Sequence, residues 1–104
     1  MKRLGGASAA KWQSRKLIRQ EDAAGAYEFY PIGRHVVIAP GVCGGRPTFK
    51  GTRVEVRTVL DCLRHGRSIP EVRKGYPSVS QAAIEEAIGL AARALAENFS
   101  LKAA

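Results

Sequence analysis

The strongest periodic pattern in the chain lies in residues 78–98, which read SVSQAAIEEAIGLAARALAEN. Apolar side chains recur there at steps of three and four residues, and this spacing predicts an amphipathic helix with one face toward a core. Ser78 or Ser80 can cap its first turn, because a serine oxygen accepts a hydrogen bond from a free backbone N–H group. The helix is expected to end near Asn98. The apolar positions are Ile84, Ala87, Ile88, Ala91 and Leu95.

Two shorter helices are predicted ahead of it. Apolar residues at helical spacing predict the first over residues 54–65 or 56–65. Ser68 and Glu71 have the spacing of a capping box and open the second, which ends at Gly75. Three helices joined by tight turns in so short a span predict a tri-helical, homeodomain-like helix-turn-helix core.

A short β segment is predicted before these helices. Aromatic and β-branched residues favour strands at residues 27–32 and 35–38, with Gly33 and Arg34 as the turn between them. Two strands alone are marginal in water, so this hairpin is expected to pair with another chain or to pack on the helices. The predicted fold is mainly α, with a short β-hairpin or β-strand segment in front of the tri-helical core.

The same patterns divide the chain into three parts. Residues 1–26 are expected to be a basic arm that is flexible or folds on a partner. Residues 27–53 form a β-strand and glycine-rich segment, a candidate dimerisation element. Residues 54–104 form the helix-turn-helix domain.

The charge of the chain indicates a polyanionic partner. Its 104 residues carry a formal net charge of +8, and the pI is about 10.1. Residues 1–57 hold 11 Lys and Arg against 4 Asp and Glu, whereas residues 58–104 hold 6 against 5. Because self-repulsion opposes folding, nucleic acid is the usual reason for such an excess, and an anionic membrane or an acidic protein is the alternative.

The composition also indicates a compartment. Cys43 and Cys62 are the two cysteines, too few for a disulfide scaffold. No stretch approaches the ~20 apolar residues of a membrane span, and the residues after Met1 lack the apolar region of a signal peptide. The expected location is the cytoplasm.

Residues 42–53 contain glycines, a lysine and a threonine, as a phosphate-binding P-loop does. A P-loop needs its lysine directly after the second glycine, whereas Lys50 precedes Gly51, so a nucleotide site is not expected. Two interpretations stay open. The segment is a turn-rich linker, or it keeps that geometry while Arg46, Lys50 and Arg53 contact DNA phosphates.

Three motifs follow one another in this half of the chain. They read CGGRPTFKGTRV at residues 43–54, GRSIPEV at 66–72 and YPSVS at 76–80. On these motifs, residues 34–94 resemble a small bacterial family described as domain of unknown function 433. The family pattern has Asp-Pro where this chain has Ala39 and Pro40, so a carboxylate is missing there.

The resemblance implies a helix-turn-helix-type fold and the role of a VapB-like antitoxin in a type II toxin–antitoxin pair. The partner would be a PIN-like ribonuclease toxin, and the antitoxin would act as a homodimer on the DNA of its own promoter. Residues 1–26 lie outside the resemblance and inherit nothing from it.

The DNA contacts expected of such a protein can be assigned to residues. If the last helix enters the DNA groove, Gln81 can pair with adenine. Glu85 and Glu86 in the same helix repel phosphate, so anchoring falls to basic residues around the turns, unless these form only a solvated face. The candidate DNA-binding residues are Arg46, Lys50, Arg53, Arg57, Arg64, Arg67, Arg73, Lys74, Ser80 and Gln81.

Contacts to the toxin are expected from the two ends of the chain. The candidates are Trp12, Lys16, Phe99 and Lys102, each of which can instead belong to a terminus that packs on the core.

No arrangement of residues indicates catalysis. His35 and His65 have no Ser, Cys or carboxylate at the spacing of a triad or an acid pair, so no catalytic residue, metal ligand or cofactor is expected. The leading hypothesis is an autoregulating antitoxin, not an enzyme. The alternatives are a module that binds only a partner protein, a transcription regulator without a toxin, and a small RNA-binding or enzyme subunit.

Overall fold

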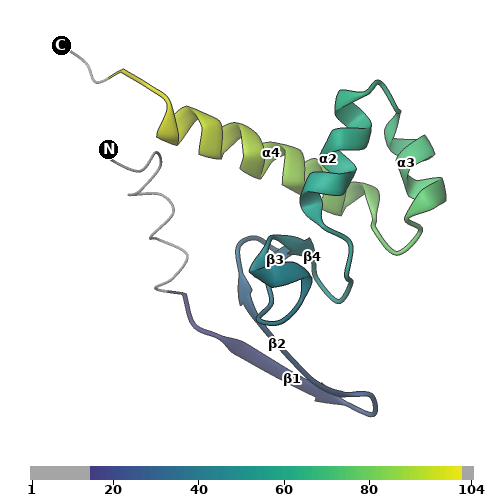
Figure 1. Ribbon diagram of the computed structural model, residues 1–104, viewed down its shortest axis with the longest axis vertical. Helices are drawn as coiled ribbons and strands as arrows, with labels where there is room; N and C mark the ends of the chain where they lie inside the picture. Colours follow the sequence, from purple (N-terminus) through teal and green to yellow (C-terminus); the bar gives the residue numbers. More distant parts are fainter. Residues whose placement is uncertain (1–14, 102–104) are drawn as a thin grey trace.

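A four-stranded antiparallel sheet precedes three helices in the computed structural model, which describes residues 15–101 (Figure 1). The strands are β1 (Ile18–Asp22), β2 (Gly25–Pro31), β3 (Val36–Ile38) and β4 (Thr48–Phe49). They lie side by side in chain order, and each pairs antiparallel with the next. Short connections are enough for this arrangement, because consecutive strands are neighbours.

The helices lie close to the positions that the apolar spacing predicts. They are α2 (Val56–Arg64), α3 (Ile69–Gly75) and α4 (Gln81–Asn98), and a single 3-10 turn, η2 (Cys43–Gly45), separates β3 from β4. The three helices pack against one another, and α4 also contacts β3.

Serine residues fix the starts of α3 and α4. The Ser68 hydroxyl accepts from the backbone N–H of Glu71 at 3.2 Å, and the Glu71 carboxylate accepts from the backbone N–H of Ser68 at 2.8 Å. The predicted capping box is confirmed. Ser80 is the residue that caps α4, through the backbone N–H of Ala83.

The predicted mainly-α, helix-turn-helix fold is wrong, because a four-stranded sheet stands in front of the helices. The predicted hairpin is present as β2 and β3, with Tyr30 opposite Ile38. The other two strands carry no alternating apolar pattern: β1, within the predicted arm, reads IRQED, and β4 has two residues. They are held by backbone pairing with their neighbours, which side-chain periodicity does not report.

The sheet contributes to a core on each of its faces. Val36 and Val37 are neighbours in β3 and therefore point in opposite directions. Val36 packs with Phe49 and with helix residues that include Ile84, whereas Val37 packs with Phe29 on the other side. The helices cover one face of the sheet, so they do not form an independent core.

Glu86 ties α4 to the turn between β2 and β3. Its carboxylate accepts hydrogen bonds from three consecutive backbone N–H groups, those of Arg34 at 2.9 Å, His35 at 2.7 Å and Val36 at 3.1 Å. Gly33 permits this approach, because a Cβ there would lie 2.6 Å from a Glu86 oxygen. Glu86 therefore has a structural role and is not part of an acidic outer face.

Thr48 is a buried polar residue in the core. Its side chain is fully buried in β4, and within the described residues its hydroxyl has no hydrogen-bond partner. A buried hydroxyl without a partner keeps its desolvation cost, and valine has nearly the same shape. We expect Thr48→Val to raise the free energy of unfolding by about 1 kcal/mol in urea titrations. Thr52→Val is the contrasting control and should destabilise, since the Thr52 hydroxyl both donates to Phe49 O and accepts from Val54 N.

Candidate nucleic-acid interface

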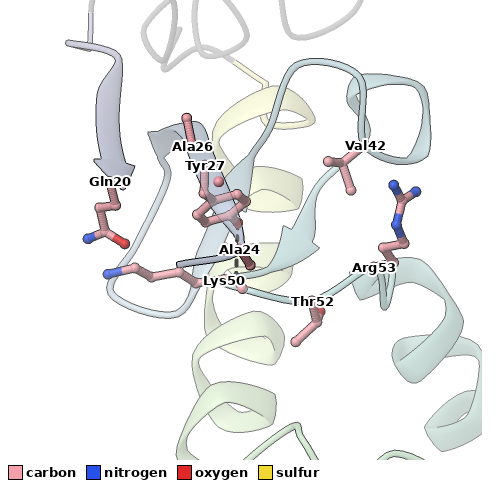
Figure 2. A pocket seen from close by; sticks show the side chains of 10 residues that line it. Gln20, Ala24, Ala26, Tyr27, Val42, Lys50, Thr52 and Arg53 are labelled. Carbon is pink, nitrogen blue, oxygen red and sulfur yellow. Dashed lines mark hydrogen bonds between the residues drawn. The ribbon is translucent and has the colours of Figure 1, made fainter. Parts of the chain in front are cut away.

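A hollow lies between the tip of the β1–β2 hairpin and the loop that joins β4 to α2 (Figure 2). Figure 2 shows Lys50 and Arg53 on opposite sides of it, with Tyr27 between them. None of the described residues that line the hollow is acidic. The lining residues are Gln20, Ala24, Gly25, Ala26, Tyr27, Val42, Lys50, Gly51, Thr52 and Arg53.

Backbone hydrogen bonds set the shape of the loop beneath the hollow. The Thr52 backbone N–H and hydroxyl both donate to the carbonyl of Phe49, at 3.0 and 2.8 Å. Gly51 has a φ of +77°, a left-handed conformation that glycine adopts without strain. Its N–H donates to the Tyr27 hydroxyl oxygen at 3.0 Å, which joins the loop to β2. Lys50 therefore lies inside this turn, and Arg53 directly follows it.

The two basic side chains are available to an anion. The Lys50 ammonium lies 5.1 Å from the centroid of the Phe29 ring, a cation–π contact that places the charge at the edge of the sheet. Among the side chains that the structure describes, no salt bridge engages Lys50 or Arg53. Because Tyr27 accepts from Gly51, its own hydroxyl hydrogen can still be donated. Such donors, with no acid among the described residues that line the hollow, suit phosphate groups.

Arg46, which the sequence groups with these two residues, is engaged elsewhere. Its guanidinium donates two hydrogen bonds to the Glu55 carboxylate, at 3.0 and 2.9 Å. This pairing lowers the pKa of Glu55 and raises the pKa of Arg46. The pair joins η2 to the start of α2, and the Arg46 charge is locally compensated.

The Arg46–Glu55 pair predicts a pH effect on stability. A carboxyl group whose pKa is lowered by folding stabilises the folded state above its unfolded pKa, and this contribution disappears as the pH falls through the folded pKa. We therefore expect the wild type to lose more stability on acidification from neutral pH than Arg46→Gln does. Chemical denaturation at a series of pH values measures the difference, and parallel pH profiles would contradict it.

The remaining basic candidates gather around α2 and α3. Arg57 and Arg64 both approach Asp61, at 3.7 and 3.4 Å. Two adjoining hollows between the C-terminal ends of α2 and α3 are lined by Arg67, and one of them also by Lys74. The two hollows share Arg67 and together form one groove. Asp61 lines the first hollow and Glu71 lines the second, so acidic side chains accompany both cations.

Three other predicted DNA contacts also make hydrogen bonds within the protein. Arg73 Nε donates to the carbonyl of Val79 at 3.1 Å, Ser80 caps α4, and the Gln81 amide donates to Glu85 at 3.1 Å. Sequence reasoning also missed Tyr27 and Gln20 as part of the hollow. Tyr27 could have been found from the sequence, because Tyr27 and Phe29 alternate on one face of β2. No sequence pattern points to Gln20.

Two of the four toxin-contact candidates lie within the described residues. Lys16 is exposed, and Phe99 is 58% exposed at the end of α4. Trp12 and Lys102 lie outside the described residues.

Among the described residues, no cluster of three or more His, Cys, Asp or Glu side chains could hold a metal ion. No helix among them has the length and apolar character needed to cross a membrane.

The fold and the hollow define a small α+β domain with a hollow at one end of its sheet, whose described lining residues include two cations and no acid. Residues 36–91 match the family model described as "Protein of unknown function (DUF433)", which is more than half of the chain. The protein belongs to this family. No curated protein and no solved structure matches the chain.

Proposed function

We propose that this protein is a DNA-binding antitoxin that contacts the phosphate backbone through the hollow at Lys50 and Arg53. The observation that carries the proposal is the pairing of a net charge of +8 with a hollow that holds two cations and, among the described residues, no acid. Phosphate contacts supply most of the affinity of DNA-binding proteins, and arginine and lysine supply most of those contacts.

The groove at Arg67 and Lys74 is a second place for phosphate contacts in this proposal. It carries less weight, because Asp61 and Glu71 line the same groove and offset its charge. Base reading is not assigned to a particular helix. The proposal therefore predicts strong binding to duplex DNA, with little dependence on base sequence at these two places.

The antitoxin role rests on the family resemblance, and its expected partner is a PIN-like ribonuclease toxin. The test is expression of the neighbouring gene with and without this chain. We expect growth arrest from the neighbour alone and rescue by co-expression. Arrest that co-expression does not relieve, or a neighbour without toxicity, would remove the antitoxin role and leave a transcription regulator.

One observation favours a second candidate, a module that binds only a partner protein. Phe99 and Leu95 are 58% and 63% exposed at the projecting end of α4, where large apolar side chains usually have a protein partner. Co-purification with the neighbouring gene product together with no binding to any DNA would favour this candidate over the first.

A further inference from the structure

The N-terminal half of helix α4 packs against the rest of the protein, whereas its C-terminal half, the bare half, is exposed to solvent. Its buried residues, Ala83, Ile84 and Ala87, all lie in the first seven positions. From residue 91 to residue 97 every side chain is exposed. Figure 1 shows the same division, with the C-terminal half of α4 reaching away from α2 and α3. An unsupported helical segment of this length is marginal in water, so a cover would stabilise it.

The bare half continues the apolar stripe that the first half buries. Ile88, Leu95 and Phe99 follow Ile84 at helical spacing and are 41%, 63% and 58% exposed. Ala91 and Ala92 lie between them on the same face. The charged residues of this half, Arg93 and Glu97, fall on the opposite face. The stripe therefore matches an apolar partner and offers nothing to an acidic or basic one.

The order of residues along the stripe is self-complementary. A two-fold axis through Leu95, with two helices antiparallel, places Leu95 opposite Leu95 of a second copy. The same axis places Phe99 of each copy opposite Ala91 of the other, a large side chain against a small one.

We propose that the C-terminal half of α4 is a homodimer interface in which two copies pair antiparallel about Leu95. This inference names the partner surface for the dimer expected of the proposed antitoxin, but it does not depend on DNA binding. Pairing of two copies predicts a monomer–dimer equilibrium that depends on protein concentration.

The test compares Leu95→Glu with Arg93→Gln by sedimentation over a wide range of protein concentration. Both variants change the net charge by −1 at exposed positions of α4, so neither should disturb folding. Leu95→Glu sets two like charges against each other at the axis, and we expect it to raise the dimer dissociation constant about 100-fold. Arg93→Gln should leave the constant within about twofold of the wild type.

Oxidative cross-linking gives a second readout of the axis. A cysteine at residue 95 would meet its own counterpart, so Leu95→Cys should form a covalent dimer far faster than Arg93→Cys, with Cys43 and Cys62 present equally in both. Cross-linking of Leu95→Cys at or below the rate of Arg93→Cys would overturn the proposal. So would a wild type that stays monomeric throughout, or a Leu95→Glu variant that still dimerises. Dimerisation without DNA affinity would overturn the proposed function alone.

Discussion

Glu86→Ala is expected to lower the free energy of unfolding by about 3 kcal/mol, because three backbone donors lose a charged acceptor. The bonds run from Arg34, His35 and Val36 to one carboxylate at 2.7 to 3.1 Å, and two of them are partly buried. Removal of the carboxylate leaves these N–H groups without their partner and frees the β2–β3 turn from α4. Urea denaturation followed by circular dichroism measures the loss.

The neighbouring Glu85 supplies the matched control. It is exposed on the same helix, and the structure gives it a hydrogen bond with the Gln81 side chain. Glu85→Ala makes the same change in charge and should alter stability by no more than about 0.5 kcal/mol. Equal losses for Glu85→Ala and Glu86→Ala would show that the carboxylate of Glu86 does not anchor the turn.

Gly33→Ala probes the same contact from the other side. Its Cβ would lie 2.6 Å from a Glu86 oxygen, so the carboxylate must move away from its three donors. We expect a loss close to that of Glu86→Ala. In the double variant that combines Gly33→Ala with Glu86→Ala, the two losses of unfolding free energy should not add, because the Cβ at residue 33 no longer meets a carboxylate at residue 86. Additive losses would indicate two independent defects.

Lys50→Gln and Arg53→Gln are each expected to weaken DNA binding by about 10-fold at moderate salt, and together by about 100-fold. Both side chains line the same hollow, and among the described side chains no acid lines it and no salt bridge engages either cation. Since phosphate contacts carry no base information, the loss should be similar for all sequences. Fluorescence anisotropy with two unrelated duplexes measures it.

Arg93→Gln is the control for these variants, because it removes one positive charge from the exposed projecting half of α4. Its affinity should stay within about twofold of the wild type. If all three variants weakened binding equally, general charge and not the hollow would account for the affinity. Circular dichroism should show the same helix and strand content for each.

Local patterns predicted those elements whose side chains carry the signal. The apolar spacing located α4, the Ser68–Glu71 spacing located α3, and β-branched residues located the hairpin of β2 and β3. β1 could not be found in this way. It is an edge strand rich in charged residues, a composition that protects sheet edges and resembles that of a solvated arm.

The contacts that shape the candidate site are long-range, so sequence spacing does not reveal them. Glu86 lies about fifty positions from its donors, and without them it reads as an acidic surface residue. Arg46 and Lys50 look equivalent in the glycine-rich segment. The structure separates them, since Arg46 is paired with Glu55, whereas Lys50 lines a hollow with no acid among its described lining residues.

The most direct test of DNA binding through the hollow is the salt dependence of affinity for the DNA upstream of the protein's own gene. The wild type should show a linear fall of log affinity with log salt concentration, because each phosphate contact releases counterions. Lys50→Gln combined with Arg53→Gln should reduce the slope by about 2. A flat dependence for the wild type, or an unchanged slope for the double variant, would contradict DNA binding at this site.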